Sequence, residues 1–275
     1  MVRHSEQLIQ ELQQKAKKFR KEILIMTTQA GSGHPGGSLS AIDILTALYF
    51  HHMRINPGSP TWESRDRFIL SKGHSCPALY VVLAELGFFQ KKELTTLRKL
   101  GSILQGHPDM NATPGVEMST GSLGQGLSVA CGISLAGKLD KRDYRVYCML
   151  GDGEIDEGSV WEAAMAASHY KLDNLTAILD RNEMQVDGIT DCIMSLEPLK
   201  EKWESFGWKT ITINGHDIEQ ILESLDLAST IEGKPTMIIA KTVKGKGISF
   251  VEKKLQYHGT VLTQEELVRA LEELD

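Results

Sequence analysis

Between Tyr144 and Ala240 the sequence alternates short apolar runs with longer stretches of helical periodicity. The runs predict strands at 145–150, 175–179, 208–213 and 236–240, and the stretches between them predict helices at 156–170, 196–206 and 218–227. Strands separated by helices are joined by crossovers, which generate a parallel sheet. The sequence therefore predicts an α/β fold, with a parallel sheet flanked by helices on both faces.

The remaining segments predict further elements of the same kind. Leu8, Leu12, Ala16, Phe19 and Ile23 stand three or four residues apart, which is the spacing of a long amphipathic helix. We also expect helices at 40–50, 78–86, 91–100 and 263–274, a short buried strand at 67–70 and a loop at 56–60. Because no Pro-, Gly- or Ser-rich linker and no repeat interrupts the chain, we expect one domain spanning residues 1–275.

Composition excludes several classes of protein. The formal net charge is -6 and there is no long Lys/Arg run, which argues against a nucleic-acid partner. The four cysteines are far apart and form no C-x-x-C pair, so a reducing compartment fits best. The N-terminus has no apolar signal segment, and no stretch approaches the roughly 20 apolar residues of a membrane span. We therefore expect a cytoplasmic protein without a membrane partner.

The segment Gly151-Asp152-Gly153-Glu154 follows an expected strand and precedes an expected helix. In a parallel sheet this position is the carboxyl edge, where ligands bind. Glycine lets the backbone come close to a ligand, and the N–H groups that open a helix attract an anion. The segment is compatible with a phosphate-binding loop, although the tripeptide alone is more often a tight turn that caps a helix.

Asn182 follows the next expected strand, so it reaches the same edge of the sheet if the two strands are neighbours. A carboxylate from Asp152, an amide oxygen from Asn182 and a nearby backbone carbonyl form an all-oxygen set that suits Mg²⁺ or Ca²⁺. The spacing between the two residues favours a cation and diphosphate site over the simple turn.

Four histidines lie in glycine-containing segments, which predicts loops rather than core positions: His34, His74, His107 and His258. One such histidine is more often an ordinary turn residue than a catalytic one. Four in one α/β chain indicate a functional site, because imidazole has a pKa near working pH.

These motifs carry a resemblance to a known family. Gly-Asp-Gly followed at a distance by Asn182 resembles the cofactor motif of thiamine diphosphate enzymes, with Arg181 where many members have a first asparagine. Together with the segments 65–74, 113–117 and 121–126, the histidine loops resemble transketolase over residues 34–259. The resemblance implies the thiamine diphosphate-binding fold, with thiamine diphosphate and Mg²⁺ or Ca²⁺ as cofactors.

The resemblance also implies roles for individual residues. Those matching His34, His107 and His258 contact the sugar and handle its hydroxyl protons, and Glu157 matches an interface glutamate in a proton network. Cofactor-contacting positions correspond to His74, Gly121, Leu123, Asp152, Gly153, Glu154, Asn182 and Val186, and Ser122 stands where many members have proline. Asp152, Asn182 and the backbone carbonyl of Met184 correspond to the metal ligands.

Thiamine catalysis needs a glutamate that protonates the aminopyrimidine ring, and in transketolases a second, pyrimidine-binding domain supplies it. This chain ends at Asp275 before any such domain, so it resembles the N-terminal subunit of a split transketolase. The expected partner is a C-terminal subunit with the pyrimidine-binding domain, in an A₂B₂ heterotetramer acting on sugar phosphates. Deoxyxylulose-phosphate synthase is a rival enzyme, although its family carries a histidine-containing loop at 121–125. A non-catalytic cofactor-binding assembly subunit is the other alternative.

Overall fold

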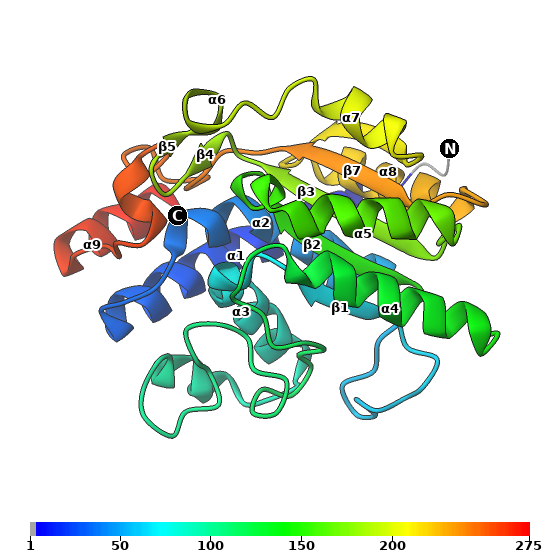
Figure 1. The fold of residues 1–275 in the computed structure, drawn as a ribbon. Coiled ribbons are helices and arrows are strands. Elements are labelled where there is room, and N and C mark those ends of the chain that lie inside the picture. The colour runs from blue at the N-terminus through cyan, green and yellow to red at the C-terminus, as the bar shows by residue number, and fades with distance from the viewer. Residues whose placement is uncertain (1–3) are drawn as a thin grey trace.

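The computed structural model describes residues 4–275 and confirms the parallel α/β fold (Figure 1). Residues 1–3 of the expected domain lie outside the described residues. One sheet has the strand order β1-β2-β3-β7-β6, and every neighbouring pair in it is parallel. Its strands are β1 (Arg67–Leu70), β2 (Val146–Gly151), β3 (Leu175–Arg181), β6 (Lys209–Asn214) and β7 (Thr236–Lys241).

The sheet is covered on both faces, because side chains that alternate along a strand enter two different cores. In β2, Tyr147 and Met149 join one hydrophobic cluster, whereas Val146, Cys148 and Leu150 join the other. The first cluster includes side chains from α1 (Glu6–Ala30), α2 (Pro35–Ala47), α3 (Cys76–Leu86), α8 (Ile218–Thr230) and α9 (Gln264–Glu273). The second includes α4 (Gln125–Leu139), α5 (Gly158–His169) and α7 (Leu199–Ser205) (Figure 1).

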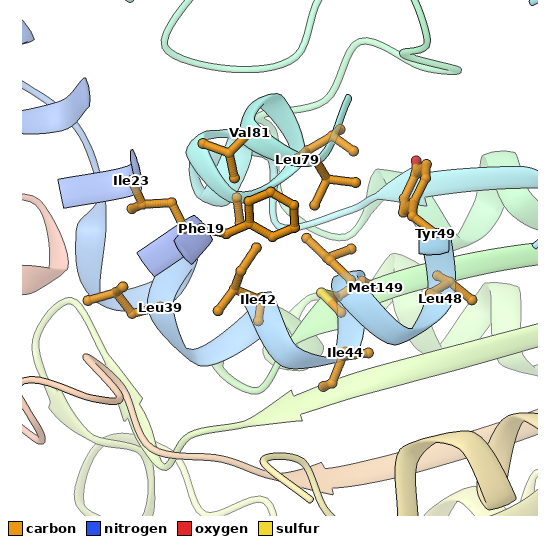
Figure 2. Close-up of a cluster of buried hydrophobic side chains, with 14 of the residues drawn as sticks. Phe19, Ile23, Leu39, Ile42, Ile44, Leu48, Tyr49, Leu79, Val81 and Met149 are labelled. Atoms are coloured by element: carbon orange, nitrogen blue, oxygen red, sulfur yellow. The ribbon is translucent and has the colours of Figure 1, made fainter. Parts of the chain in front are cut away.

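Helix α1 confirms the amphipathic helix expected at the N-terminus. Its cap is Ser5, whose Oγ accepts a hydrogen bond from the Leu8 backbone N–H at 3.2 Å. The helix ends at Gly31, where φ is 63°, a left-handed conformation that glycine adopts without steric cost. Figure 2 shows the buried face of α1, where Phe19 lies among side chains of α2 and α3 and beside Met149 of β2.

Four expected helices differ from the observed structure, and the one expected at 196–206 begins only at Leu199. Of the helix expected at 91–100, only a 3₁₀ segment at Lys91–Thr96 forms; the backbone leaves helical geometry at Leu97, where ψ is 127°, and Arg98 follows with a φ of 60°. The helix expected at 156–170 begins at Gly158 and is preceded by a separate 3₁₀ segment, Gly153–Asp156. The helix expected at 40–50 begins at Pro35 and continues past Ala47 as a π-helix, Leu48–His52.

Several elements were not expected from the sequence. Helix α4 is one of them. Others follow β3 directly, namely the antiparallel pair of strands β4 (Met184–Gln185) and β5 (Gly188–Ile189) and the short helix α6 (Thr190–Ile193). Two further 3₁₀ segments, Gly73–Ser75 and Leu255–His258, each carry one of the loop histidines. Within residues 4–275, no helix is long and apolar enough to cross a membrane.

Candidate active site

A cavity of about 230 Å³ opens at the carboxyl edge of the sheet. Most residues that the sequence assigned to the site line it, together with others that it did not single out. The lining residues are His34, Gly37, Lys72, His74, Gly121, Leu123, Gly151, Asp152, Gly153, Glu154, Asn182, Met184, Gln185, Val186, Lys244 and His258.

The three expected cation ligands come together because β2 and β3 are neighbours. Gly151 pairs with Asp180 in the register of these strands, so Asp152 and Asn182 leave the sheet side by side. The two Asp152 oxygens accept backbone N–H groups, Oδ1 from Gly153 at 2.9 Å and Oδ2 from Glu183 at 2.5 Å. Asn182 Oδ1 accepts the N–H of Met184 at 3.2 Å, which fixes the turn that presents the Met184 carbonyl.

The Asp152 carboxyl lies in an environment that disfavours its charge. Burial and the neighbouring Asp180 carboxylate raise the pKa of Asp152 to about 6, although the Arg181 guanidinium, 3.3 Å from Oδ2, opposes this. A divalent cation would offset the cost of ionising this carboxyl. Carboxylate, amide and carbonyl oxygens at one point fit the hard-ligand preference of Mg²⁺ or Ca²⁺.

Behind the cation ligands lies a buried ion pair that the sequence did not indicate. Lys72 Nζ contacts Asp180 Oδ2 and donates to the Gly37 carbonyl at 2.9 Å. Asp180 also accepts hydroxyl hydrogen bonds from Ser40, at 2.6 Å, and from Thr242. Burial alone would raise the pKa of Asp180, but the Lys72 charge and these hydrogen bonds outweigh it and hold the pKa below its usual value.

Lys244 is a second buried ammonium group of the cavity. Its Nζ lies 2.5 Å from His258 Nδ1 and 3.2 Å from the Met184 carbonyl oxygen. Burial, aided by repulsion from Lys72, lowers the pKa of Lys244 to about 8. Two amines in one cavity form a favourable site for an anion such as a diphosphate. The sequence analysis did not single out Lys244, although its place in a glycine-containing loop just beyond a strand could have indicated a site residue.

The structure also gathers the four loop histidines. The His34 ring centroid lies 5.3 Å from that of His74, 5.7 Å from that of His258 and 6.2 Å from that of His107. The rings of His74 and His258 stack, with centroids 5.3 Å apart. His107 is exposed and lies outside the cavity lining, whereas the other three line the cavity.

Two buried polar atoms of the cavity residues have no protein partner, namely His34 Nδ1 and Gln185 Nε2. Buried polar atoms are nearly always hydrogen-bonded, so each exception calls for an explanation. Both residues line the cavity, and a polar ligand bound there could supply the missing partners. The cavity therefore fits a group with phosphate and amine functions, such as thiamine diphosphate.

The three histidines that line the cavity are uncharged in the folded chain at neutral pH, because their pKa values are lowered. Burial, together with the charge of Arg98, lowers the pKa of His34 to about 4, and burial with the charge of Lys244 lowers that of His258 to about 3. Burial and the charge of Lys72 lower the pKa of His74 well below its ordinary value. A neutral imidazole has one donor and one acceptor nitrogen, so each ring can both receive and give a proton.

These pKa values predict that the folded chain loses stability in acid. In the unfolded chain the histidines bind protons near pH 6.5, whereas His34 and His258 do so only near pH 4 and 3. The unfolded chain therefore binds more protons below pH 6.5, so the histidine contribution to stability is complete above that pH and is lost as the pH falls from 6.5 through about 4 for His34 and about 3 for His258.

Denaturant unfolding at pH 7 and pH 5 measures this loss. The pKa of Asp152 is raised to about 6, so its contribution to stability increases as the pH falls, opposite to that of the histidines. Wild type must therefore be compared with a His34→Gln/His258→Gln double variant. The double variant should lose less stability between the two pH values than wild type. Exposed His169, changed to Gln, is the matched control. An equal pH dependence in wild type and the double variant would contradict the assignment.

Three other residues that the sequence assigned to the site, Glu154, Gly121 and Glu157, differ in burial and in contacts. The Glu154 carboxylate is buried and fully engaged, accepting the N–H groups of Gly124 and Gly151 at 2.9 Å each and the hydroxyl of Ser71. It ties three loops together. A Cβ at Gly121 would lie 3.1 Å from the ring of His107, so this glycine allows a close approach. Glu157 caps α5, is exposed and is not among the cavity residues.

Comparison with known proteins adds to this geometry. Residues 13–274 match the family described as transketolase, thiamine diphosphate binding domain. The chain is 48% identical to the 6-deoxy-6-sulfo-D-fructose transketolase subunit SqwG of a Clostridium species, over 98% of each chain. It is 44% identical to an apulose-4-phosphate transketolase subunit of Phocaeicola vulgatus, over 97% of this chain and 94% of that one.

Longer transketolases are similar over part of their length. The chain is 44% identical to human transketolase, and the match covers 98% of this chain but 43% of the human protein. The crystal structure of transketolase from Campylobacter jejuni superposes with a TM-score of 0.91 at 37% identity, covering 97% of this chain and 43% of that one. Both the sequence and the fold therefore place the chain in one family: it belongs to the transketolases, as their thiamine diphosphate-binding domain.

Proposed function

We propose that this chain is the diphosphate-binding subunit of a two-chain transketolase. It binds thiamine diphosphate with Mg²⁺ or Ca²⁺ and takes part in moving a two-carbon ketol unit from a ketose phosphate to an aldose phosphate. One observation carries the proposal: a single cavity combines an oxygen ligand set, two buried ammonium groups and three neutral histidines. Relatives named as transketolase subunits match the chain over nearly its whole length.

Each part of the cavity has a distinct proposed task. Asp152, Asn182 and the Met184 carbonyl would hold the cation. Lys244 and His74 would contact the diphosphate, and Gly121, Leu123, Gly153, Glu154 and Val186 would form the surrounding wall. When bound, thiamine diphosphate supplies a thiazolium carbon that accepts the two-carbon unit and stabilises its charge. Glu157, exposed at the start of α5, is proposed to act at a subunit interface.

The histidines would handle the protons of the sugar hydroxyl groups. The Lys244 ammonium can only donate, so its contact with His258 makes Nδ1 the acceptor nitrogen and leaves the ring hydrogen on Nε2. His258 therefore offers an N–H toward a substrate oxygen. His34, whose ring lies 5.7 Å away, and the more exposed His107 extend the same polar wall toward solvent.

Replacing His258 with Ala is expected to slow ketol transfer more than it weakens cofactor binding. Loss of one proton-transfer group costs about 10²–10⁴ in rate. Turnover number and thiamine diphosphate affinity should be measured on the complex with the partner chain, with exposed His169→Ala as the matched control. An unchanged rate in the His258 variant would remove this residue from the mechanism.

An exposed apolar surface lies beside the cavity and is the proposed docking site of the partner. It comprises Val186, Ile189, Ile193 and Met194, with exposed fractions of 64%, 52%, 48% and 59%. Val186 also lines the cavity, so the surface is continuous with the cofactor site. Contiguous exposed apolar side chains mark interaction sites. The occupant would be the subunit that carries the pyrimidine-binding domain, in an A₂B₂ assembly.

Ile193→Glu is expected to weaken assembly with that partner by at least tenfold, because the complex would bury an unpaired charge. The dissociation constant can be measured by analytical ultracentrifugation of the mixed chains. Leu227→Glu, on α8 and 42% exposed in the wild type, is the control for a charge introduced on another face. Equal weakening by the two variants, or by neither, would contradict the assignment of this surface.

A further inference from the structure

A network of buried charged residues lies behind the cavity, outside its lining. Arg20 of α1 and Asp43 of α2 are 8% and 6% exposed, and His216, in the loop between β6 and α8, joins them. Arg20 and His216 contact the loop 242–247, which follows β7 and carries Lys244, and Asp43 contacts both of these side chains. The proposed mechanism uses none of them.

His216 connects this network to the backbone of the loop. Its Nδ1 lies 2.7 Å from Asp43 Oδ2, and its Nε2 lies 2.8 Å from the backbone nitrogen of Val243. A backbone N–H can only donate, so Nε2 is the unprotonated nitrogen and Nδ1 carries the hydrogen that Asp43 accepts. Asp43 thus fixes both the tautomer and the orientation of the ring.

Arg20 contacts the other end of the loop and is itself oriented by the Asp43 carboxylate. Its Nη2 donates to Asp43 Oδ2 at 2.5 Å and its Nε donates to the Lys246 carbonyl at 3.1 Å. The side chain packs closely under Gly247, where φ is 99° and an added Cβ would lie 3.0 Å from Arg20 Cδ. One Asp43 oxygen therefore orients two side chains that bind the loop at residues 243 and 246.

Lys244 lies between these two anchor points. Its ammonium group reaches into the cavity, where it contacts His258 and the Met184 carbonyl at the distances given above. A long, flexible side chain occupies a defined place only if its backbone is fixed. The backbone contacts made by His216 and Arg20 meet this requirement on both sides of Lys244.

We propose that His216 is a positioning residue for the cavity: through the N–H of Val243 it fixes the loop that places Lys244, and through Lys244 it orients His258. The expected effect of His216 on catalysis rests on the proposed function. Its effect on the position of the loop does not. Residues that orient a ligand-binding group from behind typically contribute about 10-fold to 100-fold to affinity or activity.

Two conservative variants separate the two bonds of the His216 ring. His216→Asn can place a donor amide near the position of Nδ1 and keep the bond to Asp43, but it is too short to reach Val243. His216→Gln can place an acceptor oxygen near the position of Nε2 and keep the bond to Val243. Thermal unfolding of both checks that each folds, and His169→Asn, on the exposed end of α5, is the control.

The first readout is hydrogen exchange at the Val243 amide in the chain without cofactor. Exchange should be at least tenfold faster in His216→Asn than in wild type, and His216→Gln should restore most of the protection. The second readout, on the complex with the partner, is the dissociation constant of thiamine diphosphate, which should rise about 10-fold or more for the Asn variant and less for the Gln variant.

The two proposals fail in different ways. Equal protection of Val243 in the Asn and Gln variants would overturn the positioning role, whatever the chain does with cofactor. Wild-type chain that binds no thiamine diphosphate even with its partner would instead refute the proposed function, and the exchange measurement would still decide the role of His216. A drop in thermal stability that is the same for both variants, with no difference in exchange, would show that His216 serves only the fold.

Discussion

Asp152→Ala is expected to abolish metal-dependent binding of thiamine diphosphate. Among the described residues that line the cavity, Asp152 and Glu154 are the two carboxylic acids, and Glu154 already accepts three hydrogen bonds from surrounding loops. Asp152 also accepts hydrogen bonds, but it lies beside Asn182 at the paired ends of β2 and β3, so it is the acid next to the other expected cation ligands. Divalent cations of this class depend on carboxylate ligands, and a cation held by Asp152 would help to hold the diphosphate.

The fold should survive this change. Arg181 loses the Asp152 contact but keeps its hydrogen bonds to Thr190, at 2.6 Å, and to Asp191, at 3.2 Å. Asp191 provides the matched control, because its carboxylate pairs with the same guanidinium but is 58% exposed and does not line the cavity. The loop around residue 183 loses one backbone hydrogen bond, which costs about 1–3 kcal/mol.

Calorimetric titration of the partner-bound chain with thiamine diphosphate and Mg²⁺ measures the effect. The expected result is no detectable binding for Asp152→Ala and nearly wild-type binding for Asp191→Ala. Circular dichroism should show the same secondary structure in both variants. If Asp152→Ala retained wild-type affinity for the cofactor, the assignment of the cation site would be wrong.

The sheet, and the proximity of Asp152 and Asn182 at its edge, could be predicted because their signals are local. The runs at 145–150 and 175–179 are apolar and bounded by polar residues, and β2 and β3 match them to within two residues. Once the strands are parallel neighbours, their ends must meet, so the sequence alone predicts that Asp152 and Asn182 lie together. The glycine-containing loops indicated the histidines in the same way.

Helix α4 could not be predicted because the glycines in its sequence have low helix propensity. Three glycines interrupt it, which lowers helix propensity by about 1 kcal/mol each relative to alanine. The reason for two of them is visible only in three dimensions: a Cβ at Gly126 would lie 2.7 Å from Ser71 Cα, and one at Gly137 would lie 2.7 Å from the ring of Tyr144. Close packing against β1 and β2 outweighs the propensity of the segment.

The buried lysines were missed for a different reason. Lys72, Asp180 and Lys244 come from strand ends far apart in the sequence, and nothing in the sequence near each one marks it as buried. An exposed lysine is the ordinary expectation. The ammonium groups of Lys72 and Lys244 both line the cavity and favour an anionic ligand, although Lys72 is paired with Asp180, so the fold revealed features of the site that its motifs did not.

The chain is expected to act only together with a second subunit, and reconstitution of activity from the two purified chains measures this dependence. By family resemblance, the glutamate that activates the aminopyrimidine ring would belong to the pyrimidine-binding domain of the proposed partner. The relatives named as transketolase subunits are matched over 94–98% of their length, whereas human transketolase is matched over 43%. Cofactor binding by this chain can therefore exist without catalysis.

The measurement is transketolase turnover by the purified 275-residue chain with a ketose phosphate, an aldose phosphate, thiamine diphosphate and Mg²⁺, repeated in the presence of the partner chain. We predict no turnover by the chain alone and robust turnover by the mixture, at a chain ratio of one to one. Robust turnover by the chain alone would contradict the split-subunit account, and none with the partner would indicate a non-catalytic assembly subunit.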